Sequence, residues 1–265
     1  MQPIPSKPKP RSRRTYAASP AASSISEKTE AIGGTPAARA AFTRRCRAKC
    51  DSAPSGTLRV SIATDFGVNH VSPILGQFLH QFPDVTVNMV LNNRYVELIS
   101  EGFDMAIRIG ELEDSTLRAR KLTETTKRMI ASPAYFSQYG RPGKIDDLNE
   151  HKLLHYSNQS SGNVWKLTAP SGEKRQVRTA GWLTVNDGQS LLNAAIAGLG
   201  IAYLPSFLYA DALEKGLVEE AIPDLPKETQ GIYAVYPPGR FTQPKVRAFI
   251  DFLVHSFAER GPDAW

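Results

Sequence analysis

Polar side chains gather before a helical pattern in the second half of the chain, and their types suit the binding of a small polar ligand. The stretch 186–205 reads as a polar loop, a helix, a glycine turn and a short apolar strand that stops at Pro205. Asn186 and Asp187 can accept hydrogen bonds from free backbone amides at the helix start. Such a loop beside a sheet can bind an anion or another polar ligand. The alternative is an ordinary helix–strand unit of an α/β core.

Familiar catalytic patterns do not occur in the sequence. Gly198 and Gly200 form a Gly-x-Gly pair, but the pair precedes a strand instead of following one, which is the wrong context for a dinucleotide-binding loop. Neither GxxxxGK[ST] nor GxSxG is present. The five histidines, His70, His80, His151, His155 and His255, are scattered through the sequence. We therefore expect no enzyme activity, no cofactor and no metal site.

Composition indicates a globular, intracellular protein. The chain has 265 residues, of which 41% are hydrophobic, enough for one or two domains. No apolar run approaches the ~20 residues of a membrane span, and the basic N-terminus lacks the apolar core of a secretory signal. Cys46 and Cys50 cannot build a disulfide framework, and their neighbourhood lacks the partners of a zinc site. We expect reduced thiols and a cytoplasmic location.

The net charge of +6 is unevenly distributed. Residues 1–55 carry eleven Lys or Arg against three acidic residues, which is +8, whereas the remainder carries 21 basic and 23 acidic residues, which is −2. The globular part therefore has no electrostatic signature of nucleic-acid binding by itself. The basic segment is either a solvated tail or a weak, sequence-independent phosphate contact.

A domain boundary is expected near residue 55. Residues 1–34 are rich in Pro, Ser, Ala, Lys and Arg and offer no apolar face, so we predict disorder there. Residues 35–50 can form a short helix that begins at Thr35 and Pro36. DSAPSG (51–56) reads as a linker. We therefore divide the chain into a basic, partly helical tail (1–55) and one globular region (56–265).

The globular region begins with a pattern typical of a parallel sheet. Alternating apolar residues predict strands over 57–63 and 85–91, and a third strand over 105–109. Apolar residues at helical spacing lie between them, in 68–82 and again at Val96, Leu98 and Ile99. Strand–helix–strand–helix–strand calls for parallel pairing. Further along we expect an extended crossing segment over 117–126, a strand over 129–132, a hairpin around 170–173, a strand over 231–236 and a final helix over 245–259.

From Gly56 to about Glu259 the chain resembles the effector-binding domain of LysR-type transcriptional regulators. The stretches that carry the resemblance are SGTLRVSIATDFG, EGFDMAIRIGEL with STLRARKL, IASPAYFSQYGRP, GWLTVNDGQSLLNAAIAGLGIAYLPSFL and PKVRAFIDFL. It implies an α/β fold with two Rossmann-like subdomains and a central cleft, like that of type 2 periplasmic binding proteins. Subdomain one would comprise 57–123 and 233–265, and subdomain two 124–232. A small effector would bind in the cleft, and the protein would form a homodimer or tetramer.

The N-terminal part departs from this family. Full-length members begin with a winged helix-turn-helix, and KPKPRSRRTYAASPAASS has no recognition-helix pattern. Only TPAARAAFTRRCRA resembles the family's junction between the DNA-binding wing and the linker helix. We therefore expect DNA binding only through a domain that is not evident in this chain. The alternative function is that of a periplasmic-type solute-binding protein, against which the lack of an export signal argues.

The resemblance also implies which residues face the effector. They are polar or aromatic residues at strand ends and helix starts: Thr64, Asp65, Phe66, Asn92, Asn93, Arg108, Ser132, Asn186, Asp187 and Gln189. Hydroxyl and amide groups beside free backbone amides suit a small carboxylate or another polar solute.

Each of these assignments has a structural alternative. Asp65 and Asp187 can instead cap helices, and both would disfavour an anion if they point inward. Arg108 can pair with an effector carboxylate or with Asp104 or Glu111. Phe66, with Tyr203 and Phe207, can form an apolar wall of the site or belong to the core.

Overall fold

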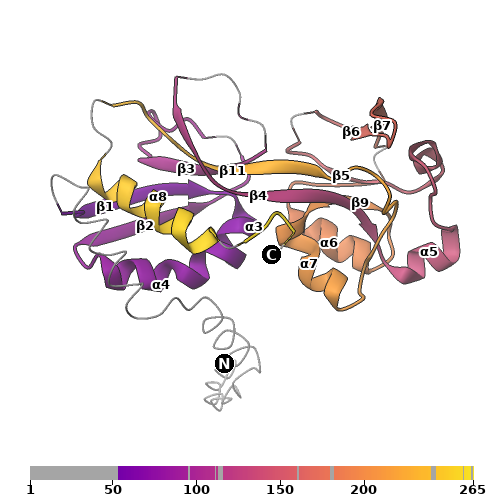
Figure 1. Ribbon diagram of the computed structural model, residues 1–265, viewed down its shortest axis with the longest axis horizontal. Coiled ribbons are helices and arrows are strands. Elements are labelled where there is room, and N and C mark those ends of the chain that lie inside the picture. The colour runs from indigo at the N-terminus through magenta and orange to yellow at the C-terminus, as the bar shows by residue number, and fades with distance from the viewer. Residues whose placement is uncertain are drawn as a thin grey trace, which may run out of the picture.

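The computed structural model describes residues 53–94, 96–110, 112, 116–159, 161–179, 182–239, 243–258, 260–263 and 265. Figure 1 shows two α/β lobes joined by two long strands, β4 (Arg118–Ala131) and β11 (Glu228–Tyr236). We call the lobe with the first strands the first lobe and the other the second lobe. The expected N-terminal tail, the helix over 35–50, Cys46 and Cys50 lie outside the described residues.

A parallel sheet forms the first lobe. Strand β1 (Gly56–Ile62) lies between β2 (Val85–Leu91) and β3 (Met105–Ile109) and pairs with both in parallel. The apolar residues of β1 alternate onto one face, where the helices α4 (Ser72–Gln81) and α8 (Pro244–Phe257) pack in the same buried core. The carboxyl ends of β1 and β2 therefore open toward the same edge of the lobe.

The chain leaves β1 through one nearly continuous helical segment. It consists of α3 (Thr64–Phe66), a π-helical turn η1 (Gly67–Val71) and α4. Pro73 has no N–H and its ring crowds the preceding turn, so a widened turn just before it lets the helix continue. The Ser72 hydroxyl donates to the carbonyl oxygen of Gly67 at 2.9 Å and satisfies part of this turn.

The helix expected around residues 96–99 does not form. Residues 98–102 form turns that end at Gly102, whose φ is +71°. Val96, Leu98 and Phe103 are nevertheless buried, and they cover the second face of the sheet together with Ala106. Val96 and Leu98 are thus buried by a short irregular segment, whereas Ile99, which the expected helix also included, is 73% exposed.

Strands β4 and β11 belong to both lobes. They pair in antiparallel register from Glu228 opposite Lys127 to Tyr236 opposite Arg118, with one irregularity between Ile232 and Tyr233. In the first lobe β11 also pairs with β3, and in the second lobe β4 pairs with β9 (Ala202–Pro205) and β10 (Glu219–Glu220). The sequence pattern predicts a crossing segment and a separate strand, whereas the structure has a single strand of 14 residues.

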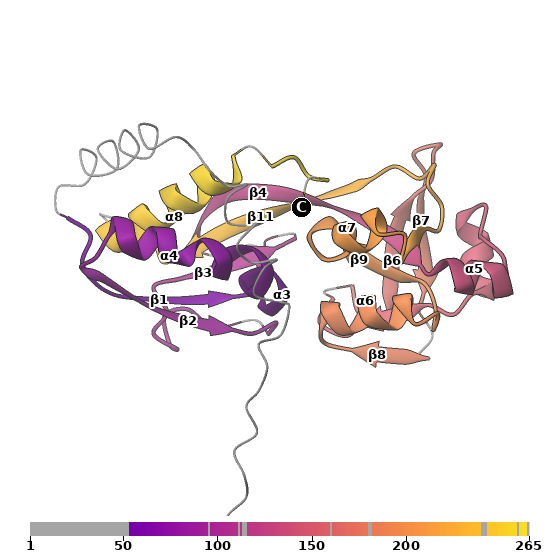
Figure 2. The ribbon, with the colours of Figure 1, turned by 90° about the horizontal axis from the view of Figure 1, so that it is seen from below.

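Strands β4 and β11 together form a two-stranded ribbon, and the second lobe surrounds the end of this ribbon at which β4 pairs with β9. Its remaining elements are α5 (Pro133–Tyr139), the 3₁₀ helix η2 (Ile145–Glu150), β5 (Leu154–Tyr156), β6 (Val164–Thr168), β7 (Lys174–Arg178), β8 (Leu183–Val185), α6 (Gly188–Ile196) and α7 (Ser206–Glu214). The hairpin expected around residues 170–173 is confirmed by the antiparallel pairing of β6 with β7. The loop–helix–strand unit over 186–205 is confirmed as α6 and β9. Figure 2 shows α6 and α7 on one side of the second lobe, facing the gap beside α3.

Among the described residues, no helix has the length and apolar character that a membrane span requires.

Gly200, in the turn that connects α6 to β9, lies against the backbone of Lys152. A Cβ atom built at Gly200 would lie 2.3 Å from the backbone oxygen of Lys152, which also accepts from the amide of Ile201 at 2.8 Å. Only glycine fits there, because a backbone atom cannot move aside as a flexible side chain can.

We expect Gly200→Ala to lower the free energy of unfolding by about 1–3 kcal/mol, as overpacking does. Urea denaturation monitored by circular dichroism measures this loss. Gly76→Ala is the control, since Gly76 lies on the exposed face of α4 with no atom near its built Cβ. It should raise stability by up to about 1 kcal/mol through helix propensity. Equal stability of the two variants would contradict the steric argument.

Candidate functional site

The N-terminus of α6 faces a carboxylate from the other lobe. Asp187 is the N-cap residue, and its Oδ1 accepts from the Ser190 amide at 2.7 Å. Asp65, in α3 of the first lobe, accepts from the amide of Gly188 at 3.0 Å through Oδ2. Two carboxylates thus converge on free amides at one helix start, where negative charge is favoured. Asp65 and Asp187 therefore both cap the N-terminus of α6, which is the helix-capping role considered for them as an alternative to effector binding.

Burial, together with the neighbouring Asp187 charge, raises the pKa of Asp65 from 3.8 to about 6, although hydrogen bonds from the amides of Gly188 and Gln189 act in the opposite direction. Asp65 therefore changes its protonation near neutral pH. In its charged form it holds the two lobes together through Gly188, and in its neutral form it relieves the repulsion from Asp187.

Asparagine side chains make the neighbouring polar contact between the lobes. Asn93, after β2, accepts from the Thr64 amide at 2.8 Å and donates through Nδ2 to the Asn186 carbonyl at 3.2 Å. Asn158 of the second lobe donates to the carbonyls of Asn93 at 3.2 Å and Asn186 at 3.4 Å. The strand-end loops of both lobes therefore meet directly, and Thr64, Asn93 and Asn186 lie together as expected.

Asn92 and Gln189 lie at the margin of this contact. The Asn92 amide donates to the Ile62 carbonyl at 3.0 Å, and its side-chain Oδ1 is buried with no hydrogen-bond partner among the described residues. Gln189 donates to Asn193 Oδ1 at 3.2 Å along the exposed side of α6. A buried amide oxygen without a donor is a costly arrangement, which a ligand that supplies an N–H or O–H would relieve.

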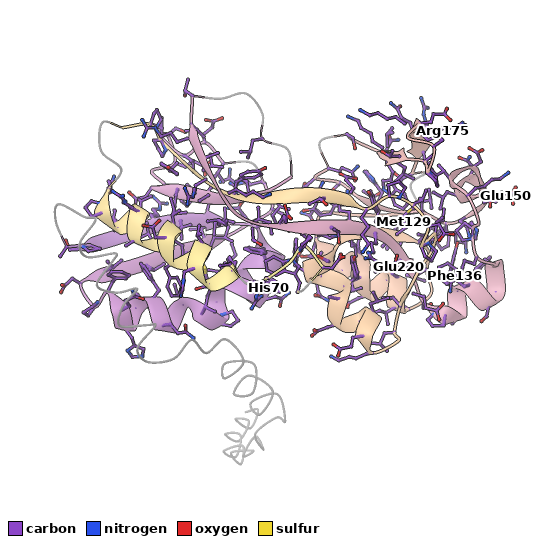
Figure 3. All side chains as sticks on the ribbon, in the orientation of Figure 1. His70, Met129, Phe136, Glu150, Arg175 and Glu220 are labelled. Atoms are coloured by element: carbon purple, nitrogen blue, oxygen red, sulfur yellow. The ribbon has the colours of Figure 1, made fainter. Side chains whose placement is uncertain are left out.

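An aromatic cluster closes the interface on the side of the ribbon. It consists of Phe66, His70, Phe207, Phe257 and Trp265, with ring centroids 4.8–6.3 Å apart. His70 Nε2 lies 3.0 Å from the carbonyl oxygen of Phe207 in the second lobe, and Figure 3 shows His70 between the lobes. Phe66 is fully buried in this cluster, so its side chain packs the core between the lobes and offers no free surface to a ligand.

Arg108 and Ser132 each form hydrogen bonds within a single lobe. Arg108 donates to the Ser61 hydroxyl at 3.3 Å within the first-lobe sheet, while Asp104 pairs with Lys245 at 2.8 Å. Ser132 is buried and caps α5. Its backbone amide donates to the Ala195 carbonyl at 3.2 Å, near the C-terminal end of α6. Ser132 therefore lies at the opposite end of α6 from Asp187.

Three contributors to the interface were not singled out from the sequence: Tyr156, Asn158 and Gly188. Burial raises the pKa of Tyr156, which also hydrogen-bonds Asn158. Asn158 follows the short strand β5, so the strand-end rule that selected Asn93 could have found it. No periodicity signal distinguishes a histidine such as His70, which contacts a backbone carbonyl of the other lobe.

In the described part of the chain, no group of three or more His, Cys, Asp or Glu is arranged to hold a metal ion.

Two α/β lobes joined by paired strands, with polar strand ends meeting between them, define a ligand-binding module with a type 2 periplasmic binding protein-like fold. The LysR substrate binding domain family matches residues 51–258. The chain therefore belongs to the LysR-type transcriptional regulators and carries their effector-binding domain. This confirms the resemblance and the fold class, and it favours a regulator over a periplasmic solute-binding protein.

The chain is similar to regulators from several bacteria. It is 36% identical over 195 residues to an uncharacterized HTH-type transcriptional regulator of Haemophilus influenzae, covering 74% of this chain and 67% of the relative. It is 31% identical over 211 residues to the transcriptional activator AaeR of Escherichia coli K12, covering 80% and 68%. The regulatory domain of CrgA from Neisseria meningitidis superposes with a TM-score of 0.67 at 30% identity, covering 76% of this chain and 98% of that domain.

The pKa of Asp65 predicts a pH dependence of stability. The folded state binds the Asp65 proton more tightly than the unfolded state, so its contribution is greatest below pH ~4 and is lost as pH rises through about 6. Between pH 4 and 7 the wild type should lose roughly 1–2 kcal/mol more than Asp65→Asn, a figure reduced for partial solvent exposure.

Urea denaturation at several pH values measures this difference. Asp84→Asn is the matched control, because Asp84 is exposed in the turn before β2, and it should keep the wild-type profile. A profile of Asp65→Asn that parallels the wild type would show that Asp65 does not titrate between the lobes.

Proposed function

We propose that this chain senses a small polar or carboxylate-bearing effector between its two lobes and transmits the resulting lobe movement to DNA binding. The observation that carries the proposal is the bond from the Gly188 amide to Asp65. An internal carboxylate already occupies the helix start, so an effector carboxylate can replace it there when Asp65 withdraws or is protonated. The unpartnered oxygen of Asn92 supplies a second recognition point, for a donor on the effector.

In this proposal the lobes are the two subdomains, 57–123 with 233–265 and 124–232. These boundaries fall inside β4 and β11, so the ribbon is the hinge about which the lobes move. The effector acts by its different affinity for two lobe arrangements, since equal affinity would shift nothing. Thr64, Asn93, Asn186 and Asp187 are the proposed contacts.

Family membership supports the remaining parts of the proposal. The relatives are transcriptional regulators, so we propose a cytoplasmic, non-catalytic protein that works as a homodimer or tetramer. Contact with DNA is assigned to a winged helix-turn-helix domain. A basic N-terminal segment by itself would bind DNA only weakly and in a salt-sensitive way.

A thermal-shift panel of small carboxylic acids, aromatic metabolites and amino acids tests effector binding. A specific effector at ~100 times its Kd should stabilise the protein by roughly 2.7 kcal/mol. Asn93→Ala removes the bonds to Thr64 and Asn186, so it should weaken that effector about five- to tenfold.

Asn149→Ala serves as the control, because Asn149 only bonds the nearby Asp146 carbonyl in η2, and it should bind as the wild type does. No response to any member of the panel, or equal affinity of Asn93→Ala and wild type, would count against a site between the lobes.

A further inference from the structure

A concave groove lies on the second lobe, on the opposite side of the β4–β9 sheet from α6 and α7. Ile130 and Leu204 face the core shared with those helices, whereas Met129 and Tyr203 face the hairpin β6–β7. The groove has a volume of about 400 Å³ between this sheet, the hairpin and residues 222–228. Figure 3 shows Arg175 on the hairpin, with Met129 and Glu220 on the neighbouring strands. Its volume is in the range of small-molecule sites.

Positive charge dominates the lining of this groove. Six Lys or Arg residues line it, against two glutamates. The arginines have partners outside the groove or at its margin, since Arg128 pairs with Glu220 and Arg175 with Glu173. Of the four lysines, Lys227 pairs with Asp263. In the part of the chain that the structure describes, no carboxylate forms an ion pair with the other three, Lys127, Lys166 and Lys174.

Lys127 differs from the exposed lysines of the hairpin. Its ammonium lies 4.0 Å from the centre of the Tyr203 ring. The nearby Glu228 is already engaged, because it accepts from the Tyr203 hydroxyl at 2.5 Å and from Gln230 Nε2 at 3.1 Å. No described residue accepts a hydrogen bond from the Lys127 ammonium. Burial lowers the pKa of Lys127, and the charge of the nearby Glu228 opposes this shift only in part.

Apolar side chains complete the groove beside this cation. Met129, Leu167, Ile222 and Leu225 line it, and the first three belong to the buried core of the second lobe. An ammonium without an acceptor, next to an apolar wall, is complementary to an amphipathic anion. A nucleic-acid backbone fits less well, since its phosphates would meet this enclosed apolar wall.

We propose that this groove is a second ligand site, separate from the interface between the lobes, that binds a small organic monocarboxylate with an aromatic or branched apolar part. The carboxylate pairs with Lys127 and is drawn in by Lys166 and Lys174. The apolar part covers Met129 and Leu167. Because β4 and β11 contribute Lys127 and Glu228 to the groove, a ligand there contacts the same strands that join the lobes.

Methyl NMR of the full chain labelled with ¹³C-methyl methionine tests this assignment with benzoate as the probe. Of the three methionines that the structure describes, Met129 lies in the groove, while Met89 and Met105 lie in the first lobe. Benzoate should shift the Met129 signal in a saturable way and leave Met89 and Met105 in place. Benzamide, which has the same shape without the charge, should bind at least about fivefold more weakly.

Two matched variants separate the charge of Lys127 from general basicity. Lys127→Gln should weaken benzoate about tenfold, as the loss of one charged hydrogen bond does. Lys215→Gln removes an equal charge from the exposed end of α7, where Lys215 faces Asp211, and should leave the benzoate affinity unchanged. Asn93→Ala should also leave it unchanged, which keeps this test independent of the effector site between the lobes.

Three outcomes would overturn the proposal. The first is a Met129 signal that does not shift at a benzoate concentration of about 10 mM, which is ten times a Kd of about 1 mM. The second is equal binding of benzoate and benzamide, or equal effects of Lys127→Gln and Lys215→Gln. The third is loss of the Met129 shift in Asn93→Ala, which would place benzoate between the lobes.

Discussion

The antiparallel pairing of β4 with β11 is the constraint on which the rest of the molecule depends. One ladder runs through both lobes, so backbone hydrogen bonds hold the lobes at a fixed spacing. Each strand also pairs with a further strand of one lobe, β11 with β3 in the first lobe and β4 with β9 in the second. Twisting or bending of a two-stranded ribbon keeps its ladder intact, whereas sliding breaks it. The relative motion of the lobes is thereby limited to rotations, which bring strand-end loops together or separate them.

The C-terminal segment reinforces this ribbon at its middle. The Pro262 carbonyl accepts from the Thr126 amide at 3.1 Å and from the Ser206 hydroxyl at 2.6 Å, and Trp265 Nε1 donates to the Glu124 carbonyl at 3.1 Å. Asp263 pairs with Lys227 at 2.8 Å, and its hydrogen bonds and neighbouring cations hold its pKa below the usual range. The crossing is therefore braced by a segment that follows α8 of the first lobe and reaches α7 of the second.

Local patterns predict those parts of the fold that local interactions determine. The strand β1, the hairpin β6–β7 and the unit over 186–205 follow from alternation, turn residues and helical spacing. The sequence pattern did not predict β4 as one continuous strand, because Lys127 and Arg128 interrupt its apolar pattern. In the structure the Lys127 ammonium lies over the Tyr203 ring and Arg128 pairs with Glu220, and both partners are distant in sequence. Strand-end position correctly brought Asn93 and Asn186 together, but it could not show that Asp65 reaches an amide of the other lobe. Contacts between lobes depend on how two cores are oriented, and that information is not local in sequence.

The contacts between the lobes combine side chains with backbone atoms in a way that affects sequence divergence. Asp65 accepts from a backbone amide, and Asn93, Asn158 and His70 each contact a backbone carbonyl across the interface. Any residue at the position of Asn186 would present the same carbonyl. The side chain of Asn186 can thus change without loss of the carbonyl that attaches the lobes. At this position the backbone carbonyl attaches the lobes and the side chain is available to contact the effector, so a substitution can change the effector that is bound without removing the contact between the lobes.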